Sequence, residues 1–179
     1  MPGPVTFVIG GCRSGKSREA QRLAEAAASR RIYVATCVPM DAEMEDRVRR
    51  HRADRDATWS TIETPLEVAR AVRERSGPET VLVVDCLTLW VTNLLLSPDP
   101  PDAPGAAVGE LVAALDDAAG PVVLVANEVG LGIVPDNGLA RRFRDWAGWV
   151  NQAVAARADR VVWMVAGIPV TVKPEGGRP

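Results

Sequence analysis

The sequence predicts an α/β fold in which helices flank a mainly parallel central sheet. Apolar runs of strand length alternate with amphipathic stretches of helix length, which is the order of a parallel sheet with helical crossovers. The central runs are almost continuous in apolar residues, as strands covered on both faces are. A glycine-rich turn joins the first run to the first helix. With 179 residues, 47% of them hydrophobic and 25% charged, the chain is expected to form one domain over residues 1–179.

In the first half of the chain, strands and helices alternate. The predicted strands are apolar or alternating runs at residues 5–9, 31–37, 59–64 and 80–85. The predicted helices lie between them, at residues 16–28, 41–55 and 65–75. The second helix begins at Asp41, a suitable N-cap, and carries acidic residues first and arginines later, which suits the helix dipole. Its core-facing residues are only Met44 and Val48, so we expect it to be exposed and weakly held.

The second half of the chain continues the same alternation. Helices are predicted at residues 86–96, 111–118 and 139–154, and strands at 122–126, 160–167 and 169–173, the last being an antiparallel edge strand. The final helix is expected to turn five apolar side chains inward: Leu139, Phe143, Trp146, Val150 and Val154. Residues 97–109 are rich in proline, aspartate, glycine and alanine and are predicted to form a long flexible excursion. Residues 175–179 are predicted to be a disordered tail.

The turn after the first strand fits the phosphate-binding pattern G-x-x-x-x-G-K-[ST] between Gly10 and Ser17. The pattern stands between a predicted strand and a predicted helix, which is the context that gives it meaning. Glycines let backbone N–H groups close around phosphate oxygens, and the helix N-terminus adds partial positive charge. Lys16 supplies a charge for the β- and γ-phosphates, and Ser17 a hydroxyl for Mg²⁺. The chain is therefore predicted to be a P-loop NTPase-type protein that binds a nucleoside triphosphate.

Composition argues against several other classes of protein. The net charge is −2, from 21 basic and 23 acidic residues, which gives no general attraction to nucleic acid or to a membrane surface. No apolar run is long enough for a membrane span, and the first residues lack the basic stretch of a secretory signal. The three cysteines are far apart and odd in number, which favours reduced thiols in a cytoplasmic protein.

Two further residues are candidates for chemistry. His51 is the only histidine, and helical spacing puts Arg47 and Arg55 on its face of the predicted helix 41–55. That helix is either a solvated basic helix with an incidental histidine or an anion-binding face that contains a nucleophilic nitrogen. Asp85 ends an apolar strand, where a carboxylate in P-loop enzymes completes the Mg²⁺ shell.

Several motifs together resemble one known family. They are the phosphate loop, the segment from Arg47 to His51, Asp85-Cys86-Leu87-Thr88 with Thr92-Asn93-Leu94-Leu95, Asn127-Glu128-Val129-Gly130-x-Gly132-Ile133-Val134-Pro135, and Arg141 through Asn151-Gln152. The combination is similar to the bifunctional adenosylcobinamide kinase/adenosylcobinamide-phosphate guanylyltransferases of cobalamin biosynthesis. The match runs in register from Val5 to about Lys173. The phosphate loop alone is generic, whereas the Asn127 segment and the single histidine after the arginines are specific.

The resemblance implies two reactions. A nucleoside triphosphate, ATP or GTP, first phosphorylates the aminopropanol hydroxyl of adenosylcobinamide. Adenosylcobinamide phosphate then takes GMP from GTP, through a GMP–histidine intermediate, and yields adenosylcobinamide-GDP. His51 falls on the position of that histidine. An imidazole that attacks the α-phosphorus splits one difficult transfer into two easier ones. Because His51 lies on a weakly anchored helix, we expect that helix to move when nucleotide binds.

The resemblance also implies a set of nucleotide contacts and an oligomeric state. GTP phosphates are expected against Gly10, Gly11, Cys12, Arg13, Ser14, Gly15, Lys16 and Ser17, and near Ala35, Thr36 and Cys37. Further contacts are expected at Arg52, Ala53, Asp54, Arg55, Glu63 and Asp85. A carboxylate at position 85 can accept from guanine N1–H and N2–H₂, so Asp85 either reads guanine or serves Mg²⁺. Cys12 departs from the alanine expected in the family. Family members are compact homotrimers.

Three other functions stay open on the sequence. The chain could be a P-loop kinase of another small molecule, with His51 incidental. It could be a non-catalytic GTP-binding switch, although it lacks the Asn-Lys-x-Asp segment of such proteins. It could also retain the guanylyltransferase activity with a lost or weak kinase half. The sequence identifies no residue as a corrinoid contact, and residues 87–93 and 127–137 are candidates by location alone.

Overall fold

The structure, a computed structural model, describes residues 2–39, 41–53, 55–174 and 176, except for the side chains of Arg47 and His51. The strands are β1 (Val5–Gly10), β2 (Arg30–Ala35), β3 (Trp59–Glu63), β4 (Thr80–Asp85), β5 (Val122–Asn127), β6 (Arg160–Val165) and β7 (Ile168–Lys173). The helices are α1 (Lys16–Ala27), α2 (Ala42–Ala53), α3 (Val68–Arg75), α4 (Leu87–Leu95), α5 (Gly105–Asp116) and α6 (Gly138–Arg157). The order of elements is the one that the sequence predicted.

The strands form one seven-stranded sheet in the order β3-β2-β4-β5-β1-β6-β7. Every neighbouring pair is parallel except β6 and β7, which are antiparallel. The α/β class with an antiparallel edge strand is therefore confirmed. The two-residue turn between β6 and β7 uses Ala166 and Gly167, both with positive φ (51° and 86°), which matches the twist of a hairpin.

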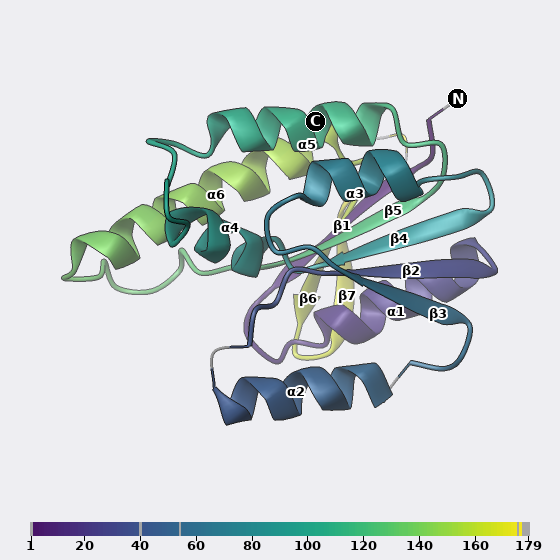
Figure 1. Ribbon diagram of the computed structural model, residues 1–179, viewed down its shortest axis with the longest axis horizontal. Helices are drawn as coiled ribbons and strands as arrows, with labels where there is room; N and C mark the ends of the chain where they lie inside the picture. The colour runs from purple at the N-terminus through teal and green to yellow at the C-terminus, as the bar shows by residue number, and fades with distance from the viewer. Residues whose placement is uncertain (1, 40, 54, 175, 177–179) are drawn as a thin grey trace.

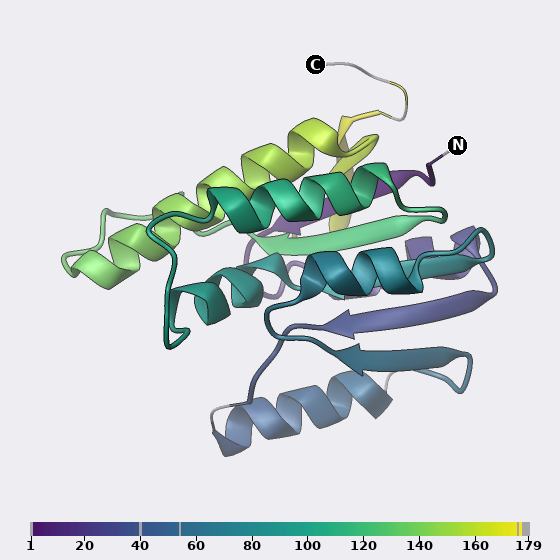
Figure 2. The same cartoon turned by 45° about the horizontal axis from the view of Figure 1, so that its top comes forward.

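Two apolar layers hold the sheet, because successive side chains of a strand point to opposite faces. On one face, Phe7, Leu82 and Leu124 pack with the helices α3 to α6. On the other face, Val8 and Val83 pack with α1. Figures 1 and 2 show the four helices α3 to α6 together on their side of the sheet. The carboxyl ends of β1, β2 and β4 consequently open at one edge of the sheet, where ligands of such folds bind.

Helix α2 stands apart from these layers, below β3 in both views (Figures 1 and 2). The Asp41 carboxylate accepts a hydrogen bond of 2.8 Å from the Met44 N–H, which confirms the N-cap. Met44 and Val48 are half-buried, and the other side chains described on this helix are exposed apart from the half-buried Asp46. The expectation of an exposed, thinly packed helix is confirmed.

Several details of the predicted elements are wrong. Helix α3 begins at Val68 rather than at Pro65, and β2 ends at Ala35 rather than at Cys37. Helix α5 begins at Gly105, so the excursion predicted over 97–109 is shorter than expected. Alanines are good helix formers, and burial of Val108 and Leu111 against the core extends the helix toward its start. Leu139, expected to point inward, is 52% exposed, because the first turn of α6 extends past the core that Trp146 and Val150 enter.

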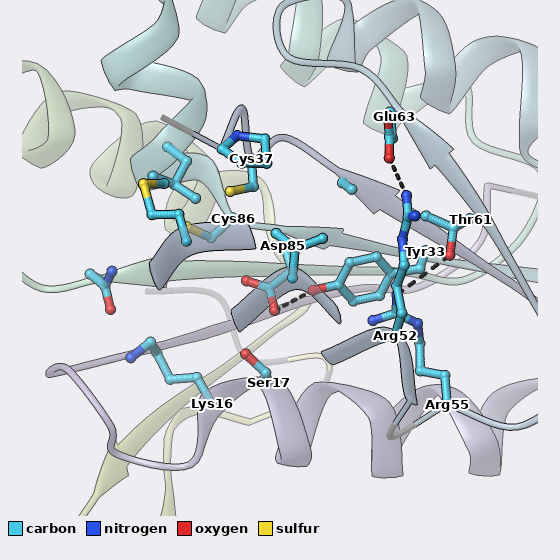
Figure 3. A pocket seen from close by; sticks show the side chains of 16 residues that line it. Lys16, Ser17, Tyr33, Cys37, Arg52, Arg55, Thr61, Glu63, Asp85 and Cys86 are labelled. Atoms are coloured by element: carbon cyan, nitrogen blue, oxygen red, sulfur yellow. Dashed lines mark hydrogen bonds and ion pairs between the residues drawn. The ribbon is translucent and has the colours of Figure 1, made fainter. Parts of the chain in front are cut away.

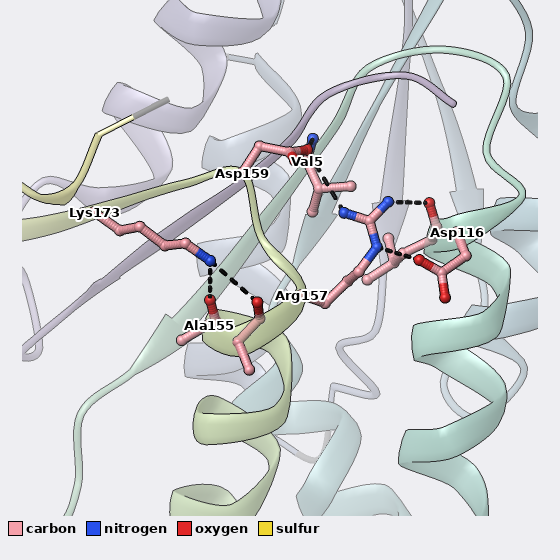
Figure 4. A network of polar contacts seen from close by, with 8 residues as sticks. Val5, Asp116, Ala155, Arg157, Asp159 and Lys173 are labelled. Carbon is pink, nitrogen blue, oxygen red and sulfur yellow. Dashed lines mark hydrogen bonds and ion pairs between the residues drawn. The ribbon is translucent and has the colours of Figure 1, made fainter. Parts of the chain in front are cut away.

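A network of charges closes the opposite edge of the sheet, at the amino end of β1 (Figure 4). Arg157 forms ion pairs with Asp116, at 2.5 Å, and with Asp159, at 3.6 Å. The Asp159 carboxylate also accepts a 2.7 Å hydrogen bond from the Val5 N–H. Lys173 donates to the carbonyls of Ala155 and Ala156 at 3.3 and 3.1 Å. These contacts join α5, α6, β1 and β7 far from the phosphate loop.

No helix within the described ranges is long and apolar enough to cross a bilayer.

Candidate functional site

A cavity of about 220 Å³ opens at the carboxyl edge of the sheet. It lies between the phosphate loop, the ends of β2, β3 and β4, and the inner face of α2 (Figure 3). Sixteen residues line it: Lys16, Ser17, Tyr33, Ala35, Cys37, Pro39, Met44, Val48, Arg52, Arg55, Thr61, Glu63, Asp85, Cys86, Leu89 and Asn127. Segments that are up to 111 residues apart in the sequence, from Lys16 to Asn127, thus meet at one place.

The phosphate loop is shaped by close packing at Gly10 and by left-handed backbone at Gly15. A Cβ added to Gly10 would lie 2.6 Å from the Met164 carbonyl oxygen and 2.9 Å from the Ser14 hydroxyl, so only glycine fits. Gly15 has φ +95° and directly precedes α1. Lys16 is 8% exposed, and its ammonium donates to the Gly11 carbonyl at 2.5 Å and lies 3.4 Å from the Ser14 hydroxyl. The loop therefore holds its cation close to the turn where phosphate oxygens are expected.

Most of the predicted site residues gather around this cavity. Lys16, Ser17, Ala35, Cys37, Arg52, Arg55, Glu63 and Asp85 line it. Gly10, Gly11, Cys12, Arg13, Ser14 and Gly15 form the turn that leads into α1. Ala53 is exposed at the last position of α2, and Asp54 lies outside the described residues. His51 belongs to the last turn of α2, one residue before Arg52.

Thr36 lies behind the cavity wall rather than on it. It is fully buried. Its hydroxyl donates to the Cys86 carbonyl at 2.8 Å and accepts from the Cys86 N–H at 2.9 Å. Asn93 donates to the Thr36 carbonyl at 2.8 Å. Thr36 therefore fixes the end of β2 against the start of α4, which holds the neighbouring Ala35 and Cys37 in position.

Tyr33 is a cavity residue that the sequence reasoning missed. Its hydroxyl donates a 2.9 Å hydrogen bond to Oδ2 of Asp85, and the Arg55 guanidinium lies over its ring at 3.8 Å from the centroid. The Trp59 ring meets it edge-on, with centroids 6.5 Å apart. The signal was present, because Tyr33, Ala35 and Cys37 alternate along one strand and must share a face. Asn127, Leu89 and Thr61 also line the cavity and were not singled out as nucleotide contacts.

Two arginines connect the end of α2 to the sheet. Arg52 forms an ion pair with Glu63 at the end of β3. Arg55 donates toward the Thr61 hydroxyl at 3.5 Å. Among the residues that the structure describes, Nη1 of Arg55 is buried and has no hydrogen-bond partner. A buried guanidinium N–H without an acceptor is costly, so this atom is suited to an anionic ligand.

Burial keeps the hydroxyl of Tyr33 and the thiol of Cys86 protonated at the cavity. Burial is the largest cause that raises the pKa of the Tyr33 hydroxyl well above 10, and the charge of Asp85 adds to it. Burial also raises the pKa of the Cys86 thiol to about 11, again with a contribution from Asp85. Both groups are therefore neutral at physiological pH, and Tyr33 can act as a hydrogen-bond donor to the carboxylate.

Sequence comparison gives one consistent result. Residues 6–172 match the family described as "Cobinamide kinase / cobinamide phosphate guanyltransferase". The "Bifunctional adenosylcobalamin biosynthesis protein CobP" of Pseudomonas aeruginosa is 46% identical over 169 residues, 94% of this chain and 97% of that protein. The "Bifunctional adenosylcobalamin biosynthesis protein CobU" of Escherichia coli and that of Salmonella typhimurium are each 42% identical over 93% of this chain and 98% of theirs.

Solved structures with a similar fold are remote in sequence. An ATPase of a bacterial type III secretion system has a TM-score of 0.56 at 11% identity, over 95% of this chain and 57% of that one. The protein PH0250 of Pyrococcus horikoshii has a TM-score of 0.54 at 9% identity, over 99% of this chain and 91% of that one. The RadB recombinase has a TM-score of 0.50 at 14% identity, over 90% of this chain and 74% of that one. At such low identity these likenesses show the fold alone.

Proposed function

The chain belongs to the cobinamide kinase / cobinamide phosphate guanyltransferase family, and on that premise we propose that it performs both reactions in adenosylcobalamin biosynthesis. It phosphorylates adenosylcobinamide at the aminopropanol hydroxyl, with ATP or GTP as donor. It then transfers GMP from GTP to adenosylcobinamide phosphate and forms adenosylcobinamide-GDP. The observation that carries the proposal is that the phosphate loop and the helix containing His51 border one cavity.

In the kinase step, the substrate hydroxyl oxygen forms a bond to the γ-phosphorus while the bond to the leaving nucleoside diphosphate breaks. Negative charge then grows on the bridging and γ-phosphate oxygens. Lys16 at the phosphate loop stabilises this charge, and the backbone N–H groups of residues 10–17 bind the phosphates. Low exposure of Lys16 makes its charge more effective than it would be in bulk water.

In the guanylyl-transfer step, the His51 imidazole attacks the α-phosphorus of GTP and pyrophosphate leaves. A phosphate oxygen of adenosylcobinamide phosphate then attacks the phosphorus of the GMP–histidine, and the imidazole is released. Arg52 and Arg55, from the same end of α2, lie at the cavity and neutralise the phosphate charge. Asp85 accepts hydrogen bonds from guanine N1–H and N2–H₂, and selects GTP over ATP in this step.

The residues of the site fit Mg²⁺ that binds together with the nucleotide. The Ser17 hydroxyl lines the cavity beside Lys16, and Mg²⁺ binds through few protein oxygens together with phosphates and water. Within the described part of the chain, no group of three or more histidine, cysteine, aspartate or glutamate side chains forms a metal site by itself. When bound, the ion neutralises charge on the β- and γ-phosphate oxygens.

We also propose that the chain acts as one catalytic domain, in the cytoplasm and as a homotrimer. Support for reduced surroundings comes from the three cysteines, none of which forms a disulfide bond in the structure. Support for self-association comes from apolar side chains left exposed on β6 and β7: Trp163, Val165, Ile168, Val170 and Val172. The apolar residues of α4, in contrast, pack mainly in the core of their own chain.

The test is to incubate the protein with α-³²P-labelled GTP and Mg²⁺ and to separate it by denaturing electrophoresis. We expect a label that acid removes and base does not, as for a phosphoramidate, and that His51→Ala abolishes. Arg50→Ala is the matched control, because Arg50 is exposed on the same helix turn and pairs with Asp46. A wild type that binds GTP but takes no label would overturn the nucleophilic role of His51.

A further inference from the structure

Tyr33 is the one tyrosine of the chain, and no reaction step above uses it. Its side chain is 7% exposed, although it borders a cavity lined by charged groups. Asp85 from β4 and Arg55 just beyond α2 contact it (Figure 3). Trp59 from β3 meets the edge of its ring. Tyr33 thus contacts both Asp85, the proposed guanine acceptor, and Arg55, which follows the helix that contains His51. It can position both.

The hydroxyl group of Tyr33 fixes one oxygen of Asp85. It donates to Oδ2 at 2.9 Å and leaves Oδ1 outside this hydrogen bond. Asp85 pairs in register with Ala35 of β2, two residues beyond Tyr33, so the phenol reaches along its own strand to the carboxylate. A carboxylate held by one oxygen has a defined plane, and it presents the other oxygen to a ligand in one direction.

The ring of Tyr33 holds the chain just after α2. The Arg55 guanidinium lies 3.8 Å above the ring centroid, the distance of a close cation–π contact. The Arg55 N–H donates to the Arg52 carbonyl at 3.2 Å, so its backbone continues from the last turn of the helix. The few other attachments of this end of α2 include the Arg52–Glu63 ion pair, both of whose side chains are more than half exposed. An exposed ion pair contributes little, so the buried ring is the firmer anchor.

We propose that Tyr33 is a positioning residue for guanylyl transfer, through two separate contacts. Its hydroxyl orients Asp85 toward the guanine edge and so sets the preference for GTP. Its ring face holds Arg55 and thereby sets the position of the helix that contains His51. The inference rests on the proposed function, and it predicts that the two contacts can be separated by mutation.

Tyr33→Phe keeps the ring and removes the hydroxyl. We expect the affinity ratio of GTP over inosine triphosphate, which lacks the 2-amino group, to fall by about 10-fold, the value of one hydrogen bond to a charged group. Labelling of the enzyme at saturating GTP should stay within about 3-fold of the wild-type rate, because Arg55 keeps its platform. A merely structural role would weaken both nucleotides equally. An unchanged GTP/inosine triphosphate ratio, measured by titration calorimetry, would overturn the role of the hydroxyl.

Tyr33→Leu removes the ring as well. We expect the same loss of base preference and, in addition, a fall in the labelling rate at saturating GTP by about 10-fold or more, since misplacement of a nucleophile is costly. Amide exchange over residues 42–53 should become faster in Tyr33→Leu but not in Tyr33→Phe. Wild-type exchange and labelling in Tyr33→Leu would overturn the role of the ring. If this variant does not fold, the longer, unbranched Tyr33→Met replaces it.

Trp59→Phe is the control. Trp59 touches the edge of the Tyr33 ring, and phenylalanine keeps an aromatic partner there. It should keep the nucleotide ratio and the labelling rate of the wild type. The calorimetric ratio is measured without corrinoid and in the His51→Ala background, so that no GMP–histidine forms during the titration. A wild type that takes no label therefore counts against the proposed function, whereas an unchanged ratio in Tyr33→Phe counts against the role assigned to Tyr33.

Discussion

At the scale of single residues, the site combines a lysine that is hydrogen-bonded to its own loop with a tyrosine and a cysteine that stay protonated. Lys16 donates to the loop that it serves, so its charge needs little rearrangement when phosphate arrives. Tyr33 and Cys86 stay protonated beside Asp85, because burial and that negative charge raise both pKa values.

Cys86 gives a pH prediction for stability. Its pKa is raised from 9.0 to about 11 in the folded protein, so its contribution to stability is complete below pH 9 and is lost as the pH rises toward 11. A shift of this size corresponds to about 2–3 kcal/mol of unfolding free energy. Urea unfolding between pH 8 and 11 should show the loss in the wild type and a smaller loss in Cys86→Ala. Cys12→Ala, at an exposed position of the phosphate loop, is the control and should keep the wild-type slope.

At the scale of elements, α2 differs from the other five helices. The others bury apolar faces in the two core layers. Helix α2 instead presents Met44 and Val48 to a cavity and is held by arginines at its end. Such a helix has a low free energy of local opening. A weakly attached helix that carries the proposed nucleophile, His51, can move toward the α-phosphate when nucleotide supplies further contacts.

We therefore expect GTP to slow amide exchange in residues 42–53 by about 10-fold or more, because the phosphates give Arg52 and Arg55 new partners. Exchange in α5, which lies on the other face of the sheet, should not change. Hydrogen-exchange mass spectrometry measures both. Equal exchange of α2 with and without GTP would contradict the movement. Glu63→Gln should make the nucleotide-free helix exchange only slightly faster, because the exposed ion pair with Arg52 that it removes contributes little.

At the scale of the whole molecule, the carboxyl ends and the amino ends of the strands have different roles. The carboxyl edge carries the cavity, and the amino edge carries the network around Arg157 (Figure 4). That network ties β1 and α5 to α6, while the phosphate loop extends from the far end of β1. Stability and chemistry should therefore respond to different mutations.

Arg157→Met tests this separation. The arginine side chain is 16% exposed and bonds to Asp116, Asp159 and the Leu115 carbonyl, so its loss should lower the unfolding free energy by about 1–3 kcal/mol. The rate of labelling by GTP should remain that of the wild type below the melting temperature. Arg73→Met, which removes one exposed contact with the Glu110 carbonyl, should cost less than about 0.5 kcal/mol. Equal costs for the two variants would contradict the structural role of Arg157.

The proposed homotrimer is also a property of the whole molecule. Apolar residues on the exposed faces of β6 and β7, among them Ile168 at 65% and Val172 at 62% exposure, favour burial against another surface. Light scattering after size exclusion should give three times the 19.1 kDa of one chain. A mass of one chain at micromolar concentration would contradict the trimer.

The order of elements, the sheet class and the phosphate loop were all predictable from the sequence. Each rests on local patterns: apolar runs, helical spacing, and glycines followed by a lysine and a serine. The sequence also indicated much of the cavity: Lys16, Ser17 and Asp85 from local patterns, and Arg52 and Glu63 only through the family resemblance. The start of α5 and the exposure of Leu139 could not be read locally, because packing against distant helices sets both.

Which side chains share a site depends on the arrangement of the strands in three dimensions. Parallel pairing puts β2 between β3 and β4 and brings Tyr33 to Asp85, a residue 52 positions away. The same pairing lets Arg55 lie on the Tyr33 ring, which no helical or strand period relates to it. Local periodicity specifies the face on which a side chain lies, whereas the order of strands in the sheet specifies its neighbours. The sequence therefore could not show that Tyr33 contacts Asp85 and Arg55.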